Sequence, residues 1–177
     1  PISQNPTPAQ LKAKFEEKLE EAALSDVGGE RGPEEEHEAP EASRPHGTVV
    51  NSRLMGTGLE LVYEAVKRSA QSGAFSLTVG GDHSVAAASI AAQHTAYPQL
   101  GIIWVDAHAD ANTPATSPSG HYHGMPAAHL MGWFKERIEG FDWFPEGGCV
   151  EESRLAYIGL RDIDAEEDRK STRLNSS

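Results

Sequence analysis

Asp106, His108 and Asp110 stand at alternate positions in the stretch VDAHADAN, which begins where an apolar run ends. In an extended strand, residues i, i+2 and i+4 point to the same face, so the spacing predicts that these three side chains converge. Two carboxylates and an imidazole held together repel one another or suffer a desolvation penalty unless a cation lies between them. The pattern therefore favours a metal site.

The chemistry of the ligands narrows the choice of metal. Carboxylate oxygens with imidazole nitrogen suit Mn, Zn or Fe rather than a metal that prefers thiolates. His83, in the motif GGDHS, is a fourth candidate ligand, although it, Asp82 or Ser84 could instead cap the helix that follows. Four ligands exceed what one tetrahedral site with an open position needs. Two ions about 3.5–4 Å apart, bridged by a carboxylate and activating a bridging water, accommodate them better.

Apolar runs in the sequence predict three buried strands separated by helices. Because strands alternate with helices, we expect an α/β fold with a parallel sheet and crossover helices. GGDHS, DAHAD and RDID each lie at or just past the end of one strand, and ligands bind at the carboxyl ends of such strands, so the three motifs predict a single cleft. The strands are expected at Phe75–Val79, Leu100–Asp106 and Leu155–Leu160, and the helices at about Leu54–Ser72, Val85–His94 and from Met125.

A loop of small polar side chains follows the carboxylate motif. The segment Asn112–Gly124, NTPATSPSGHYHG, is either an ordinary turn-rich connection or a lip that hydrogen-bonds a polar, charged small molecule beside the metals. His123 stands at the end of this loop, with His121 close by. Beside a hydrolytic metal centre, an imidazole at that position could relay protons.

Composition excludes several classes of function. The chain has 177 residues, enough for one domain with a real core, and a net charge of -12, which argues against a nucleic-acid partner. No apolar run approaches the roughly 20 residues that a membrane span needs, so we expect no membrane association. Cys149 is the one cysteine, which rules out an internal disulfide and fits a reducing compartment.

The sequence also divides into parts of different composition. Pro8–Leu24 has apolar residues at helical spacing, and Ser25–Gly47 is rich in Gly, Pro and Glu with little to bury, which predicts a helix followed by a mobile linker. We therefore expect three regions: residues 1–47, a globular domain over residues 48–170, and a terminal segment over residues 171–177.

Four motifs in this order, GGDHS, WVDAHADANTP, SGHYHGMP and YIGLRDID, resemble those of the ureohydrolase family, and specifically of the arginases. The resemblance covers roughly residues 48–170. It implies a three-layer α/β/α fold with a mainly parallel sheet, of the arginase/deacetylase type, which we expect to be incomplete at both ends of this chain. The stretch NTPATSPSG resembles the arginase version of a loop that differs in agmatinases.

The resemblance implies a pair of Mn²⁺ ions that hydrolyse L-arginine to L-ornithine and urea. His83 and Asp110 would hold one ion together with Asp106. His108 would hold the other, and Asp106 would bridge the two. It also implies that the substrate is a small molecule, L-arginine, and that the protein forms homo-oligomers, as members of the family often do. We expect a cytoplasmic location, with the mitochondrion as the alternative.

The family's substrate-binding residues also have counterparts here. Asn112 and Ser119 would bind the α-carboxylate of the substrate, with Ser117 where arginases often have Thr. Asp164 would meet the α-amino group, and Glu167 would do so through water. His123 would act as the proton shuttle that helps the amine to leave.

The sequence also departs from the family pattern. A further DxDxxDP motif and a later Glu, which complete the metal and guanidinium sites in the family, do not occur, and the last residues, STRLNSS, do not resemble the next family element. We therefore expect part of an arginase with little or no activity of its own. The alternatives are a non-catalytic fragment or pseudoenzyme and another ureohydrolase, such as an agmatinase.

Overall fold

The computed structural model describes residues 47–163 together with residues 10, 13, 16, 17 and 20. The predicted helix over residues 8–24, the linker and the terminal segment lie almost wholly outside the described residues. Within them, the helices are α2 (Ser52–Gln71), α3 (Val85–Ala96) and α4 (Pro126–Leu130), and the strands are β1 (Ile102–Val105) and β2 (Leu155–Ile158). Two short 3₁₀ turns, η2 (Tyr122–Gly124) and η3 (Glu152–Arg154), complete the set.

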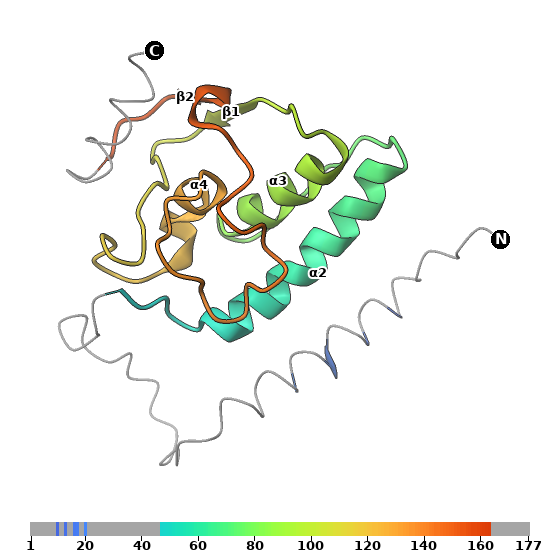
Figure 1. Cartoon of the computed structure of the whole chain (residues 1–177), viewed down its shortest axis with the longest axis horizontal. Coiled ribbons are helices and arrows are strands. Elements are labelled where there is room, and N and C mark those ends of the chain that lie inside the picture. The colour runs from blue at the N-terminus through green and yellow to red at the C-terminus, as the bar shows by residue number, and fades with distance from the viewer. Residues whose placement is uncertain (1–9, 11–12, 14–15, 18–19, 21–46, 164–177) are drawn as a thin grey trace.

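β1 and β2 form a parallel pair, which confirms the predicted strand direction. Ile102 lies opposite Leu155 and Val105 lies opposite Ile158. Asp106 extends the pairing by donating its N–H to the carbonyl of Ile158 over 3.1 Å. Figure 1 shows the two strands at one end of the folded part, with α2 and α3 side by side below them. Both strands end at the same edge, so the segments that follow them, residues 106–112 and 159–163, lie close together.

The prediction of a buried strand at Phe75–Val79 is wrong. No strand of the described chain includes these residues, and Phe75, Leu77 and Val79 are 92%, 79% and 86% exposed. A strand needs a neighbour to satisfy its backbone hydrogen bonds. In the described part of the chain β1 and β2 pair only with each other, and this apolar segment pairs with neither of them.

The prediction that β1 is buried is correct for only one of its faces. Trp104 is 4% exposed, whereas its neighbours Ile103 and Val105 are 70% and 73% exposed. Successive side chains of a strand point to opposite faces. The helices therefore cover one face of the two-stranded sheet, and the other face lies open over the described residues.

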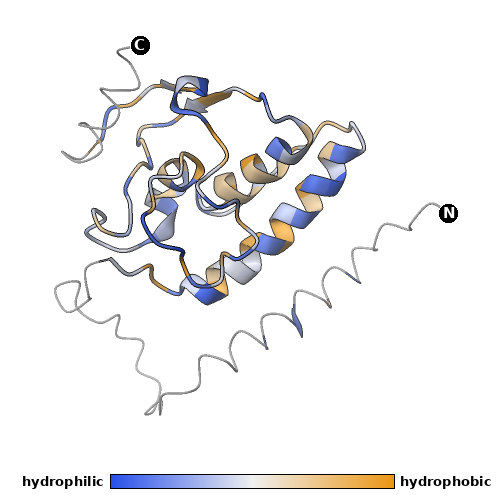
Figure 2. Cartoon of the chain, in the orientation of Figure 1, coloured by the Kyte–Doolittle hydropathy of each residue, from blue (hydrophilic) through white to orange (hydrophobic). Residues whose placement is uncertain are grey.

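α2 and α3 form the body of the core. Figure 2 shows apolar and polar residues alternating along α2, while most of α3 is apolar. A helix that is apolar on every side belongs inside a core, and an amphipathic helix belongs at its surface. None of the described helices has both the length and the apolar content that crossing a membrane requires. The fully buried residues of α3 are all small, namely Ala87, Ala88, Ala91 and Ala92, each 0% exposed.

At Gly56, α2 lies in close contact with the loop before β2. A side-chain carbon at Gly56 would collide with the backbone carbonyl of Gly140 and touch the ring of Phe141. The indole N–H of Trp143 donates to the carbonyl of Gly56 over 2.9 Å, which holds the loop against the helix. The absence of a side chain at Gly56 is therefore a packing requirement, whereas Gly58 has nothing within 4 Å of the same position.

This difference predicts opposite effects for two matched substitutions in one helix. Gly58→Ala should stabilise the fold by about 0.5–1 kcal/mol, because alanine loses less backbone entropy in a helix. Gly56→Ala should destabilise it by about 1–3 kcal/mol, because backbone atoms must move to admit the methyl group. Urea denaturation of both variants measures the effects. A Gly56→Ala variant as stable as Gly58→Ala would contradict the packing.

His129 is a buried histidine surrounded by aromatic rings. Its imidazole stacks on Phe134 and Phe144, with ring centroids 4.3 and 3.7 Å away, and its Nδ1 lies 2.7 Å from the hydroxyl oxygen of Tyr122. When Nδ1 of the neutral imidazole carries no proton, it accepts a hydrogen bond from the hydroxyl of Tyr122. Burial disfavours the charged ring and lowers the pKa of His129 from 6.5 to about 3.

The lowered pKa of His129 predicts a loss of stability in mild acid. In the unfolded chain His129 becomes protonated below about pH 6.5, whereas in the folded chain it stays neutral down to about pH 3. The contribution is therefore fully present above pH 6.5 and is lost as the pH falls, with a slope that approaches about 1.4 kcal/mol per pH unit. His129→Gln keeps an acceptor for Tyr122 but cannot titrate. Unfolding free energies between pH 5 and 7 should fall less steeply for this variant, and an identical slope would refute the assignment.

Candidate metal centre

Three predicted ligands lie together at the edge where the strands end. Ligand atoms of His83, Asp106 and Asp110 all lie within 4.8 Å of one another. The Nδ1 atom of His83 is 2.6 Å from Oδ2 of Asp110 and 2.9 Å from Oδ2 of Asp106. The imidazole thus faces the two carboxylates and does not cap α3. Two carboxylate oxygens and one imidazole nitrogen around a common point form a set of ligand atoms suited to a divalent cation.

The backbone conformation that brings these side chains together differs from the predicted extended strand. β1 ends at Val105, so Asp106, His108 and Asp110 do not alternate along a strand. The chain bends after Val105, and Asp110 has a φ of 47°, in the left-handed region that Asp adopts more readily than most residues. The carbonyl of Asp110 accepts the N–H of Ala127 over 3.0 Å, which fixes this turn against α4. The convergence is therefore a property of a bent and anchored loop.

His108 lies on the other side of Asp106. Its Nδ1 is 3.6 Å from Oδ1 of Asp106, and its Nε2 is 3.4 Å from Oδ2 of Asp162. Asp106 therefore directs one oxygen toward His83 and the other toward His108. The carboxylate of Asp106 thus lies between two imidazoles, but only that of His83 belongs to the group of ligand atoms within 4.8 Å of one another.

The charges of the cluster are strongly coupled. A hydrogen bond to Asp110 raises the pKa of His83, against the opposing effect of burial, and the charge of Asp110 adds to the rise. Burial pushes the pKa of Asp106 upward, but the backbone N–H of His108 and the positive charge of His83 outweigh it, so the net pKa of Asp106 is lowered. Both shifts mark a site whose anionic oxygens attract positive charge, which a divalent ion supplies more strongly than a proton.

Two residues outside the predicted set of ligands hold the histidines of the cluster in position. Trp104 is 4% exposed, and its ring centroid lies 4.5 Å from that of His83. Asp162 approaches the second nitrogen of His108, as carboxylates do when they orient a metal-binding histidine. Both had signals in the sequence. Trp104 comes two residues before Asp106, and Asp162 lies inside the RDID motif.

The polar loop after Asp110 is held by its own side chains. Asn112 is 7% exposed, and its Oδ1 accepts the hydroxyl of Thr116 over 2.9 Å. The Oγ of Ser117 accepts the N–H of Gly120 over 3.0 Å, and the Oγ of Ser119 accepts the N–H of His121 over 3.2 Å. These bonds are those of a turn-rich connection, and they also fix the positions of the groups expected to bind substrate.

The remaining predicted residues fall into two groups. His123 is exposed, and its ring stacks on His121 with centroids 5.8 Å apart. Asp164 and Glu167 lie outside the described residues.

The sequence matches the model of the Arginase family over residues 4–176, beyond the motif-bearing segment at both ends. The chain belongs to the arginase family. This membership confirms the resemblance of the four motifs and places the α/β arrangement in the arginase fold.

Individual relatives agree with the family match. The chain is 44% identical over 117 residues to Arginase of Saccharomyces cerevisiae and 43% identical over 122 residues to Arginase of Eremothecium gossypii. It spans about a third of the length of these curated relatives, 34% and 30% respectively. Among solved structures, a cold-adapted arginase from Glaciozyma antarctica superposes with a TM-score of 0.63 at 41% identity, covering 70% of this chain and 44% of that one.

The cluster predicts metal binding that depends on its own carboxylates. Mn²⁺ titrated into the purified chain and followed by electron paramagnetic resonance should show binding that weakens at least about tenfold in His83→Ala and in Asp110→Asn. Asp142→Asn removes an exposed carboxylate that lies 3.6 Å from Arg137 and outside the cluster, so the Mn²⁺ affinity should not change. Equal Mn²⁺ affinities in all three variants would show that the cluster does not hold the ion.

Proposed function

We propose that the protein to which this chain belongs is an arginase, which uses two Mn²⁺ ions to hydrolyse L-arginine to L-ornithine and urea. The observation that carries the proposal is the position of Asp106, with Oδ2 at 2.9 Å from His83 and Oδ1 at 3.6 Å from His108. The membership of the arginase family and the names of the curated relatives support the same reaction.

The donor set fits the two ions of this proposal. His83, Asp106 and Asp110 would hold one ion, and His108 would hold the other across the bridging carboxylate of Asp106. When bound, the ions would supply a water molecule activated for attack at neutral pH. Asp162 would orient His108 through Nε2, and Trp104 would hold the ring of His83 in place.

The polar loop would position the amino-acid end of the substrate. Asn112 and Ser119 are proposed to bind its α-carboxylate, with Ser117 alongside. The internal hydrogen bonds of these three side chains would hold the loop in one shape before the ligand arrives, which lowers the entropic cost of binding. Asp164 and Glu167 are proposed to meet the α-amino group.

His123 is proposed to move the proton that the leaving amine needs. Its exposure allows exchange with water, which a proton relay requires. An imidazole suits this step because one of its nitrogens can accept a proton while the other donates one.

We propose the cytoplasm as the compartment, because a single cysteine fits a reducing environment. The mitochondrion is the alternative, and one relative, from Bos taurus, is named Arginase-2, mitochondrial. Assembly into homo-oligomers is proposed on the resemblance alone.

The activity of the 177-residue chain itself is predicted to be very low. The sequence offers four metal ligands for two ions and lacks the family's further Asp pair and guanidinium-binding Glu, so both metal affinity and substrate orientation should suffer. Urea release from L-arginine with excess Mn²⁺ should stay at least about a hundredfold below that of an intact arginase. Turnover close to the intact enzyme would mean that other residues complete the site.

A chimaera tests the proposed function in a protein that also contains the further Asp pair and the Glu. Residues 48–163 of this chain would replace the matching segment of the Saccharomyces cerevisiae arginase, whose own remainder supplies the other ligands. We expect Mn²⁺-dependent urea release from L-arginine and little from agmatine. His123→Asn in the chimaera should lower turnover while the Mn²⁺ content stays unchanged. A chimaera that binds Mn²⁺ but is inert, or that prefers agmatine, would overturn the proposal.

A further inference from the structure

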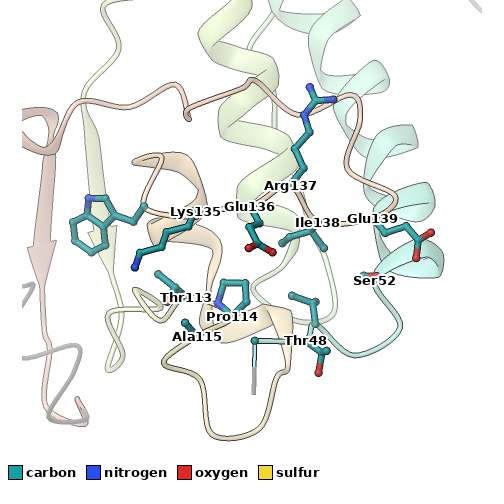
Figure 3. Close-up of a pocket in the computed structure, with 13 residues that line it drawn as sticks. Thr48, Ser52, Thr113, Pro114, Ala115, Lys135, Glu136, Arg137, Ile138 and Glu139 are labelled. Carbon is teal, nitrogen blue, oxygen red and sulfur yellow. The ribbon is translucent and has the colours of Figure 1, made fainter. Parts of the chain in front are cut away.

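A cavity lies apart from the candidate metal ligands. It has a volume of about 590 Å³ and is enclosed by residues 47–52 before and at the start of α2, residues 113–115 of the polar loop and residues 133–139 after α4. Figure 3 shows the loop over residues 135–139 facing Thr113, Pro114 and Ala115 across this space. None of the candidate metal ligands lines it, and its volume is typical of small-molecule sites.

Two opposite charges enter the cavity from neighbouring positions. In Figure 3 the side chains of Lys135 and Glu136 extend from their loop toward Thr113 and Pro114, while Arg137 extends the opposite way. Neither Lys135 nor Glu136 pairs with another residue in the described part of the chain. The other charged residues at the rim are already paired, because Arg137 lies 3.6 Å from Asp142 and Glu139 binds Arg53.

The rest of the wall is mostly apolar and well fixed. Ile138 is 9% exposed and Pro114 faces it across the cavity. The indole ring of Trp133 is held by its N–H, which donates to Glu152 over 2.8 Å. The cavity therefore combines one free cation, one free carboxylate and a rigid apolar surface between three chain segments.

We propose that this cavity binds a free α-amino acid in its zwitterionic form. The Lys135 ammonium would pair with the α-carboxylate of the ligand, the Glu136 carboxylate would pair with its α-ammonium, and an apolar ligand side chain would lie on Pro114, Ile138 and Trp133. A simple anion would meet Glu136 unpaired, and a simple cation would meet Lys135 unpaired, so each is disfavoured relative to a ligand that carries both charges.

The position of the cavity gives binding a consequence for the metal centre. Thr113 and Pro114 follow directly on Asn112, so a ligand that bridges them to residues 133–139 would restrain the loop that ends at His123. The site itself needs neither metal nor arginase activity, so the inference stands independently of the proposed function.

The test uses three ligands that differ only in charge. L-leucine, 4-methylpentanoate and 3-methylbutylamine share one apolar side chain, and the last two lack the ammonium and the carboxylate respectively. Isothermal titration of the purified 177-residue chain in the presence of a chelator should show L-leucine binding with a dissociation constant on the order of 1 mM. Each single-charge analogue should bind at least about fivefold more weakly.

Matched variants locate the binding. Lys135→Met and Glu136→Gln should each weaken L-leucine at least about fivefold. Arg137→Gln alters a rim side chain that extends away from the space and pairs with Asp142, and Glu146→Gln alters a charge outside the cavity, so neither should weaken binding. All four positions are exposed, and thermal unfolding checks that each variant stays folded.

The proposal fails if the three ligands bind equally, if no heat appears at about 20 mM L-leucine, or if binding survives both cavity variants and is lost in Asn112→Ala. The last result would place the amino acid at the polar loop instead.

Discussion

The approach of two carboxylates to one imidazole is the interaction on which the rest of the molecule depends. Asp110 is 6% exposed, and its Oδ2 lies 2.6 Å from Nδ1 of His83, while Asp106 approaches the same nitrogen. Buried anions at this distance destabilise a fold unless positive charge offsets them. The strands, the turn at Asp110 and the start of α3 are therefore constrained to deliver three groups to one point, where a divalent ion supplies more charge than a protonated histidine.

The surrounding structure meets this constraint through close packing of small residues. The buried alanines of α3 and Gly56 of α2 bring the two helices and the loop before β2 within contact. This packing fixes the position of α3, and with it His83, which lies two residues before that helix. The ring of Trp104, which belongs to β1, then packs against the imidazole of His83. The same few residues therefore pack the core and position the candidate metal ligands.

One loop connects the two sites of the molecule. Asn112 follows the turn at Asp110, and Thr113 and Pro114 line the cavity, so the two candidate sites lie at opposite ends of a stretch of only a few residues. Internal hydrogen bonds from Asn112, Ser117 and Ser119 give this loop a defined shape.

The sequence by itself determined the local elements and the chemistry. α2 and α3 begin and end within about two residues of the predicted bounds because their apolar spacing acts locally, and the motifs identified the family and the candidate ligands. Only the tertiary structure decided that Phe75–Val79 is not a strand, since a strand exists through its partner, and that one face of β1 is open. It also decided that a left-handed Asp110, and not strand alternation, gathers the ligands. The contacts of Trp104 with His83 and of Asp162 with His108, and the cavity at Lys135 and Glu136, also depended on the tertiary structure, because each joins segments that are distant in the chain.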